Sequence, residues 1–274
     1  ACIGHAAQHG VGHAARRFFS YINVKRIHAV SSWIQPLLSI YNFTFLNYRL
    51  NIKRSFFRKN CLLCASSNMD DLCAPCRMSL PYLPHSCCPV CALPTMEGHI
   101  CGACLAEPPA FDHTVAALQY AFPVDALIHS LKYRENLAMA TLLADLLMAK
   151  MDGSTLPDFV VPMPLHPARL RQRGFNQALE IARRVSKKSG IALLPDACQR
   201  IKDTPPQTGL PWKERAQNIR GAFACEMDLT GKHVAVLDDV MTTGTTLIEL
   251  AKVLRKRGAM KISAWVVART LREK

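Results

Sequence analysis

The sequence has no acidic residue in its first sixty positions and no long hydrophobic run. Residues 1–60 carry nine Lys and Arg and neither Asp nor Glu. Apolar runs such as residues 233–237 fall far short of the roughly 20 residues that a membrane-spanning helix needs, so we expect no transmembrane span. Hydrophobic residues still make up 50% of the chain, which excludes a mainly disordered protein and provides for one or two ordinary cores.

The acid-free segment also lacks a helical or alternating hydrophobic period. An absence of acids is typical of an organellar transit peptide, but Ser is not abundant here and no amphipathic Arg face is visible. We therefore interpret residues 1–60 as a basic N-terminal extension, either a poorly ordered tail or a non-native upstream extension, with a transit peptide as the alternative. No function is assigned to this extension.

The net charge is strongly positive, at +14. Residues 155–274 contain 21 basic and 11 acidic residues, so most of the excess lies in the C-terminal half. A basic chain favours phosphate-bearing partners such as nucleotides, nucleic acid or anionic membrane surfaces. Charge alone does not choose among these partners.

Eight of the twelve cysteines form four Cys-x-x-Cys pairs, arranged as two repeats of nearly equal spacing. The repeats consist of Cys61, Cys64, Cys73 and Cys76, and of Cys88, Cys91, Cys101 and Cys104. Two such pairs supply four thiolates at the ~2.3 Å Zn–S distance and leave no open position, which predicts two structural zinc sites in a double zinc ribbon over residues 61–108. A segment this short cannot bury much hydrophobic core, and the bound metal must therefore contribute to its folding energy.

Other arrangements of the cysteines remain open. Four disulfides are the alternative to zinc, but the pair spacing favours metal and therefore a reducing, cytoplasmic location. Pairing of zinc ligands across the two repeats is one alternative, and replacement of Cys88 by Cys87 is another. We interpret Cys2, Cys198 and Cys225 as ordinary thiols, since they lie outside the spacing.

Strands alternate with helices beyond the sequence Glu107-Pro108-Pro109, where we place the domain boundary. We expect strands at 114–122, 158–164, 233–238 and 261–269, and helices at 124–133, 137–150, 174–189 and 245–256. This alternation predicts an α/β domain over residues 112–274, a parallel sheet with helices on both faces.

The segment 234–247, VAVLDDVMTTGTTL, predicts a phosphate-binding loop between a strand and a helix. Backbone N–H groups at a helix N-terminus hold a phosphate, and Gly244 lets the backbone approach it closely. Asp238 and Asp239, at the carboxyl end of the strand, are placed to accept hydrogen bonds from two ribose hydroxyls. Further donors are the hydroxyls of Thr242, Thr243, Thr245 and Thr246. The alternative is a strand-ending turn followed by helix caps.

This run resembles the signature of type I phosphoribosyltransferases. It lacks the Gly-Lys-Ser/Thr of a P-loop and the Gly-x-Gly of a dinucleotide-binding fingerprint. The resemblance implies that the loop holds the ribose 5-phosphate of phosphoribosyl diphosphate. It also implies that Asp238 and Asp239 hold the 2- and 3-hydroxyls as the catalytic acids.

Two further basic segments follow the strands. Arg169, Arg171 and Arg173 alternate after strand 158–164, so we expect them on an extended segment before a helix that begins near Gly174. This pattern predicts a diphosphate site, with a solvated basic loop as the alternative. The long loop 204–223 has two interpretations: it is a lid that closes over a phosphorylated ligand, or it is an ordinary surface loop. Its polar candidates are Lys213, Arg215, Asn218 and Arg220.

The whole pattern resembles the ComF family over roughly residues 61–270. The matching segments are the double ribbon with Cys101-Gly-Ala-Cys-Leu105, Leu131-Lys-Tyr133, Arg173-Gly-Phe-Asn-Gln177, Asn218-Ile-Arg-Gly-Ala-Phe223 and the phosphate loop. The resemblance implies natural competence, handling of imported single-stranded DNA, and a phosphoribosyltransferase fold.

The resemblance leaves two functions open. A transferase would use Mg²⁺ to bridge the diphosphate, although the sequence identifies no acceptor. The alternative is a non-catalytic module that binds single-stranded DNA, in which the phosphate loop is a ligand sensor or a relic.

Overall fold

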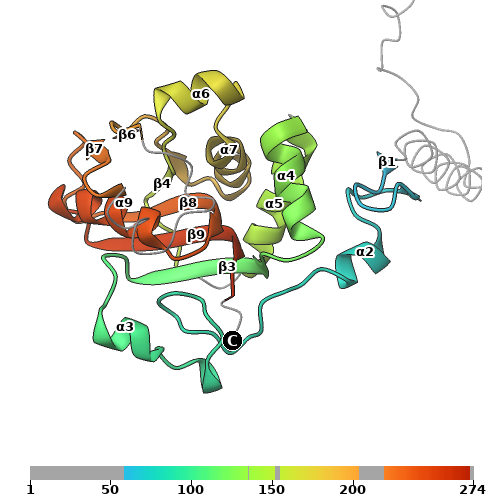
Figure 1. Ribbon diagram of the computed structural model, residues 1–274, viewed down its shortest axis with the longest axis horizontal. Coiled ribbons are helices and arrows are strands. Elements are labelled where there is room, and N and C mark those ends of the chain that lie inside the picture. The colour runs from blue at the N-terminus through green and yellow to red at the C-terminus, as the bar shows by residue number, and fades with distance from the viewer. Residues whose placement is uncertain (1–58, 135, 152–154, 204–218, 272–274) are drawn as a thin grey trace, which may run out of the picture. The chain divides into compact units, whose positions relative to one another are not determined.

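A parallel sheet of five strands, in the order β3-β9-β8-β4-β5, forms the centre of the fold (Figure 1). The computed structural model describes residues 59–134, 136–151, 155–203 and 219–271, so the predictions for residues 1–58 lie outside the described residues. The strands are β3 His113–Gln119, β4 Phe159–Pro162, β5 Ala192–Leu193, β8 His233–Met241 and β9 Lys261–Arg269. β8 and β9 are buried along most of their length, as expected for the inner strands of a parallel sheet.

Helices cover both faces of this sheet, which confirms the predicted fold class. The helices are α4 Val124–Arg134, α5 Leu137–Lys150, α6 Pro167–Arg173, α7 Gln177–Ser189 and α9 Thr245–Lys256. Figure 1 shows α5 and α7 side by side above the sheet. The crossover β4–α7–β5 runs away from β8, and β8–α9–β9 runs the opposite way. Because such crossovers are right-handed, α7 and α9 lie on opposite faces.

The cysteine-rich segment precedes the sheet and covers its edge. Its elements are β1 Lys59–Asn60, β2 Ser67–Asn68, α2 Ala74–Met78, the 3-10 turn η1 Met96–Gly98 and α3 Gly102–Ala106. Leu83 N donates to Ala117 O at 3.4 Å, and Gln119 N donates to Pro81 O at 2.7 Å. The edge strand β3 therefore has hydrogen-bond partners on both sides.

A separate antiparallel pair consists of β6 Cys198–Arg200 and β7 Phe223–Cys225.

Helices 137–150 and 245–256 and strand 261–269 lie where the sequence predicts them. The extended segment expected around Arg171 is wrong, because residues 167–173 form α6. Pro167 occupies the first helical turn, the His166 side chain accepts from Ala168 N at 3.3 Å, and Gly174 ends the helix at φ 80°. No helix in the described part of the chain is long and apolar enough to cross a membrane.

A small antiparallel pair was not predicted, because β6 and β7 have three residues each, too few to show a hydrophobic period. The predicted strand 114–122 ends at Gln119, and the predicted strand 233–238 extends to Met241. These differences leave the order of the larger elements unchanged.

Candidate functional site

The carboxyl ends of β4 and β8 lie side by side where the strand order reverses. β4 continues to β5 in one direction, and β8 continues to β9 in the other. The connections that follow β4 and β8 therefore leave on opposite faces of the sheet. Ligands of open parallel sheets bind at such a point. The structure places Asp238, Asp239 and the predicted phosphate loop there.

The phosphate loop turns sharply at Gly244 and leads directly into α9. Gly244 has φ 81°, in the left-handed region that favours glycine, and a Cβ there would lie 2.7 Å from Met241 Cε. The hydroxyls of Thr243 and Thr245 lie 2.8 Å apart. Gly244, at the N-cap of α9, provides no side-chain cap, and the Thr243 hydroxyl accepts from Thr245 N, the first N–H of the helix, at 3.4 Å. Thr242 is exposed and Thr246 half-buried on the same turn.

Two carboxylates and one ammonium group meet below this loop. Asp239 is 4% exposed, and Lys132 Nζ from α4 lies 2.5 Å from its Oδ2. Asp239 N donates to Asp238 Oδ1 at 2.9 Å. Burial, followed by the charge of Asp239, raises the pKa of Asp238 well above its ordinary value. Burial alone would lower the pKa of Lys132, but the charge and hydrogen bonding of Asp239 outweigh it and raise that pKa.

The arginines after β4 are separated by the turn of α6. Arg169 and Arg173, four residues apart, lie on one face of the helix and are half-buried, whereas Arg171 is exposed. Arg173 Nη1 donates to Gln177 Oε1 at 2.7 Å, and its guanidinium lies 5.6 Å from the ring centroid of Tyr133, the residue after Lys132. The helix therefore turns two of the three arginines toward the side where α4 lies.

The expected N-terminus near Gly174 is also corrected. α7 begins at Gln177, and Asn176 Oδ1 accepts from Ala178 N at 3.0 Å and from Leu179 N at 3.4 Å. Asn176 Nδ2 donates to Met163 O at 3.0 Å and ties this cap to the end of β4. The first amides of α7 are thus already engaged within the protein.

An additional arginine lies near this helix. Arg200, on β6, is 8% exposed, and its guanidinium lies 5.9 Å from the ring centroid of Phe223. Burial and the nearby charge of Arg169 lower its pKa, whereas Asp238 acts in the opposite direction. Two guanidinium groups are therefore gathered near the buried acids, an arrangement suited to an anion with several charges.

Only the end of the predicted lid is described. Lys213, Arg215 and Asn218 lie outside the described residues. Arg220 is exposed, and its carbonyl accepts from Lys202 Nζ at 2.8 Å. Gly221 N lies 3.4 Å from Glu249 Oε2 on α9.

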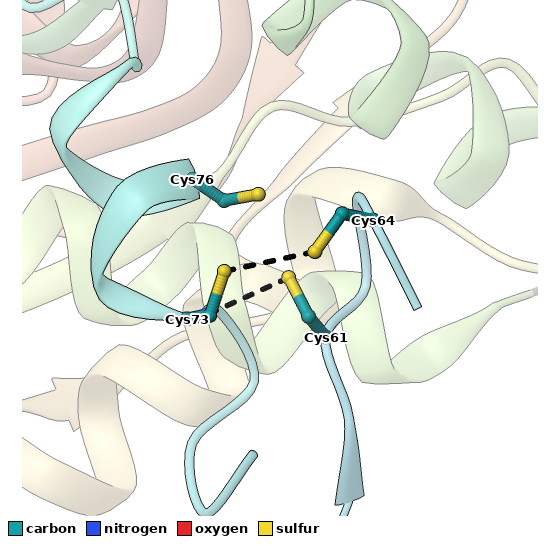
Figure 2. A group of neighbouring side chains, drawn as sticks. All are labelled: Cys61, Cys64, Cys73 and Cys76. Carbon is teal, nitrogen blue, oxygen red and sulfur yellow. Dashed lines mark hydrogen bonds between the residues drawn. The ribbon is translucent and has the colours of Figure 1, made fainter. Parts of the chain in front are cut away.

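The cysteine repeats form two separate four-sulfur groups, with one Cys-x-x-Cys pair from each half of a repeat. Within each group the sulfurs lie within 4.8 Å of one another, and Figure 2 shows the side chains of the first group converging. The groups are Cys61, Cys64, Cys73 and Cys76, and Cys88, Cys91, Cys101 and Cys104. The ligand pairing thus stays within each repeat.

Distances within these groups fit tetrahedral zinc. The Sγ atoms of Cys64 and Cys73 lie 3.6 Å apart, as do those of Cys91 and Cys101, close to the ~3.8 Å edge of a tetrahedron with ~2.3 Å Zn–S bonds. Cys73 N donates to Cys61 Sγ at 3.4 Å. Burial would raise the pKa of Cys61, but backbone hydrogen bonds from Cys64 and Cys73 outweigh it and lower the pKa to about 6, which favours the thiolate that zinc needs.

Cys87, the alternative ligand, is directed elsewhere. Its Sγ donates to Pro84 O at 3.3 Å, and Cys88 takes the place in the second group. Cys198 and Cys225 are buried register partners on β6 and β7.

Comparison with known proteins agrees with this architecture. Residues 52–105 match the double zinc ribbon domain, and residues 177–274 match the phosphoribosyl transferase domain. Competence protein F of Haemophilus influenzae is 33% identical over 229 residues, which cover 78% of this chain and 99% of that protein. The chain belongs to the ComF family. The DNA utilization protein YhgH of Escherichia coli (strain K12) is 35% identical over 191 residues, 67% of this chain and 84% of that protein.

A solved structure adds little to the ComF assignment. The purine phosphoribosyltransferase from Pyrococcus horikoshii Ot3 is 21% identical and covers 57% of this chain and 77% of its own, with a TM-score of only 0.29. The ribbon match and the two four-sulfur groups identify the ComF cysteines as structural zinc sites.

Three site features could not be inferred from sequence. Lys132 appeared only within a family segment, and its pairing with Asp239 joins residues 107 positions apart. Arg200 and Arg269 lie in no motif, and only the fold brings Arg200 near Asp238 and Arg269 to the carbonyl of Met241. Each is the last residue of a strand, and an arginine at a strand end is only a weak sequence signal of a binding site.

Proposed function

We propose that this ComF protein binds phosphoribosyl diphosphate in the crevice between β4 and β8. The observation that carries the proposal is that the turn at Gly244 and the start of α9 follow the buried Lys132–Asp239 pair at the end of β8. A helix N-terminus suits a phosphate, and carboxylates beside it suit ribose hydroxyls. Both are needed for a sugar phosphate, whereas a simple anion site needs no acids.

The roles follow from position. In the proposal, the amides and hydroxyls of residues 242–246 bind the 5-phosphate, and Asp238 and Asp239 accept from the 2- and 3-hydroxyls. The guanidinium groups of Arg169, Arg173 and Arg200 face the diphosphate side. Mg²⁺, held through the diphosphate oxygens and the carboxylates, would neutralise charge on the leaving group.

Lys132 reduces the repulsion between the two carboxylates and the proposed ligand. Two adjacent carboxylates would repel a ligand that carries several negative charges. The ammonium group 2.5 Å from Asp239 offsets one of them within the protein. It also provides a charge partner for Asp239 at a position only 4% exposed.

Group transfer from this complex requires little covalent participation by the protein. As the bond from C1 to the diphosphate breaks, the electron pair leaves with the diphosphate and C1 becomes oxocarbenium-like. A nucleophilic acceptor then attacks C1. The side chains contribute by positioning the ribose and stabilising charge.

The names of two relatives support a role in the handling of DNA. One relative is named for competence and another for DNA utilization. We propose that this chain, too, acts in DNA uptake in the cytoplasm, together with the uptake machinery.

A second function is favoured by one observation. Tyr133 is 65% exposed, with His129 at 4.5 Å between ring centroids and the Arg173 guanidinium beside it. Bases of single-stranded DNA stack on such aromatic rings next to cations. In this alternative the protein is a non-catalytic DNA-binding module, and the phosphate loop senses a ligand.

One pair of assays separates the two functions. Diphosphate release from phosphoribosyl diphosphate is measured with a panel of nucleobases, and binding to an oligonucleotide is measured at several salt concentrations. Release with at least one acceptor supports the transferase. An absence of release with every acceptor, together with tight and salt-dependent DNA binding, supports the DNA-binding module.

A further inference from the structure

Arg269 is a buried cation that contacts both the second zinc ribbon and the phosphate loop. It is the last residue of β9 and only 4% exposed. Its Nε donates to Cys91 O at 2.8 Å. Its Nη1 donates to Met241 O at 2.9 Å, and also to Thr242 O. One guanidinium therefore joins a zinc ligand to the residues at which the loop begins.

The zinc side of this link is held in place by the metal site. Cys91 belongs to the knuckle 88–91, whose turn brings two sulfurs to one ion. Thr114 on β3 fixes the same knuckle, because its N–H donates to Pro89 O at 2.9 Å and its hydroxyl donates to Val90 O at 2.6 Å. Without zinc, the four gathered thiolates lose the ion that holds them together, so the Cys91 carbonyl is held less firmly, by the contacts of Thr114 with the neighbouring residues.

The ligand side of the link is equally direct. Met241 and Thr242 come just before the turn at Gly244, whose amides and hydroxyls are the proposed phosphate-binding groups. Binding groups must be positioned closely, since a displacement of about 1 Å can cost on the order of 100-fold in an enzyme. A guanidinium anchored to both carbonyls fixes where this turn begins.

The first zinc ribbon has no such connection. In the described part of the chain, the hydrogen bonds made by residues 59–80 stay within residues 59–82. The two ribbons have the same metal chemistry and different attachment. The chain therefore contains its own control.

We infer that Arg269 is a positioning residue through which zinc at the second ribbon sets the affinity of the phosphate loop for its ligand. This inference rests on the proposed binding of phosphoribosyl diphosphate. It assigns different roles to the two ribbons: the second supports the ligand site, and the first does not.

Matched zinc-ligand variants of the full chain test the inference. Cys104→Ser and Cys76→Ser remove equivalent ligands. Each is the last cysteine of its repeat and lies in a short helix, α3 for Cys104 and α2 for Cys76. Both should lose one zinc, measured by metal analysis. Calorimetry with Mg²⁺ and phosphoribosyl diphosphate should show a Kd about tenfold or more weaker for Cys104→Ser. For Cys76→Ser the Kd should stay within about twofold of the wild type.

Reciprocal linkage gives a second readout on the unmodified protein. If zinc raises ligand affinity, the ligand must raise zinc affinity by the same factor. Phosphoribosyl diphosphate should therefore slow the release of one zinc to a chromogenic chelator and leave the other unchanged. In Arg269→Lys, with one donor group in place of a planar fork, this protection should be lost. A residue needed only for folding would not selectively uncouple one of the two zinc ions.

Each outcome decides the matter. Equal affinity of Cys104→Ser and wild type, equal weakening by both cysteine variants, or equal protection of both zinc ions would overturn the inference. If Cys104→Ser does not fold, the chelator measurement on the wild type decides alone. A wild-type protein with two zinc ions and no affinity for phosphoribosyl diphosphate would instead refute the proposed function on which the inference rests.

Discussion

Asp238 lies in an environment that is unfavourable for an ionised carboxyl. Its carboxyl is held beside Asp239 in a site where burial raises its pKa well above the ordinary value. A carboxyl with a raised folded-state pKa contributes stability that is present below its unfolded pKa, ~3.9, and is lost as pH rises through the folded value. At neutral pH this carboxyl therefore disfavours the ligand-free fold, as residues of a binding site often do.

Asp238→Asn should therefore stabilise the ligand-free protein and weaken ligand binding. The difference in Tm between variant and wild type should be smallest near pH 4, close to the unfolded pKa of ~3.9, and should grow as the pH rises toward 8, because only the wild type loses stability once the carboxyl of its unfolded state ionises. Thermal unfolding across this pH range measures the difference. A variant that is less stable than the wild type at pH 8 would contradict the assigned environment of Asp238.

Lys132→Met should have the opposite effect on stability. It leaves the Asp239 carboxylate 4% exposed without its cation, so we expect a loss of about 1–3 kcal/mol in the free energy of unfolding. Urea unfolding measures this loss. Adding Asp239→Asn should recover part of it, because the buried negative charge is then gone. Losses that simply add would show that the two side chains do not interact.

At the scale of elements, the sequence predicts the longer helices and strands well. Strand 261–269 and helices 137–150 and 245–256 follow from hydrophobic period and end signals, and these local signals agree with the tertiary fold. The phosphate loop was also predictable, because its strand, acids, glycine and helix start are consecutive. Its contacts with Lys132 and Arg269 were not, since they depend on strand order and on helices distant in sequence.

Helix α6 shows how a local pattern misleads. Alternating arginines indicate an extended segment, but the Pro167 start and the Gly174 end define two turns of helix. The helix keeps Arg169 and Arg173 together and turns Arg171 away. The pattern identified a basic segment, but only the structure shows that this segment is a helix.

The face of α6 yields a direct prediction. Arg169→Ala and Arg173→Ala should each weaken binding of phosphoribosyl diphosphate by about tenfold, the contribution of a charge-assisted hydrogen bond. Arg171→Ala, which removes the same charge from the exposed face, should change the Kd less than twofold, or about 0.4 kcal/mol. Calorimetry with all three variants measures this. Equal effects would indicate a general electrostatic attraction rather than a site on one face.

At the scale of the whole molecule, the ComF protein combines two zinc ribbons with a sheet domain through the edge strand β3 and Arg269. The sequence predicted both parts from spacing and period, but not their contacts. Hydrogen bonds between residues far apart in the chain, such as that from Arg269 to Cys91, have no local signature.

The zinc content tests the pairing within the repeats. The purified protein should contain two zinc ions per chain, and Cys76→Ser should retain one, because its group is separate from that of Cys104. Metal analysis by mass spectrometry measures both values. If the single substitution removed both ions, the two groups would share ligands, contrary to the structure.

The central claim is that the crevice at residues 238–246 binds phosphoribosyl diphosphate through its acids and its loop. The most direct measurement is calorimetric titration of Mg²⁺ and phosphoribosyl diphosphate into the wild type, Asp238→Asn with Asp239→Asn, and the exposed control Asp196→Asn. The account predicts saturable binding by the wild type and the control, and no binding by the folded double variant. Unchanged affinity in the double variant would contradict it.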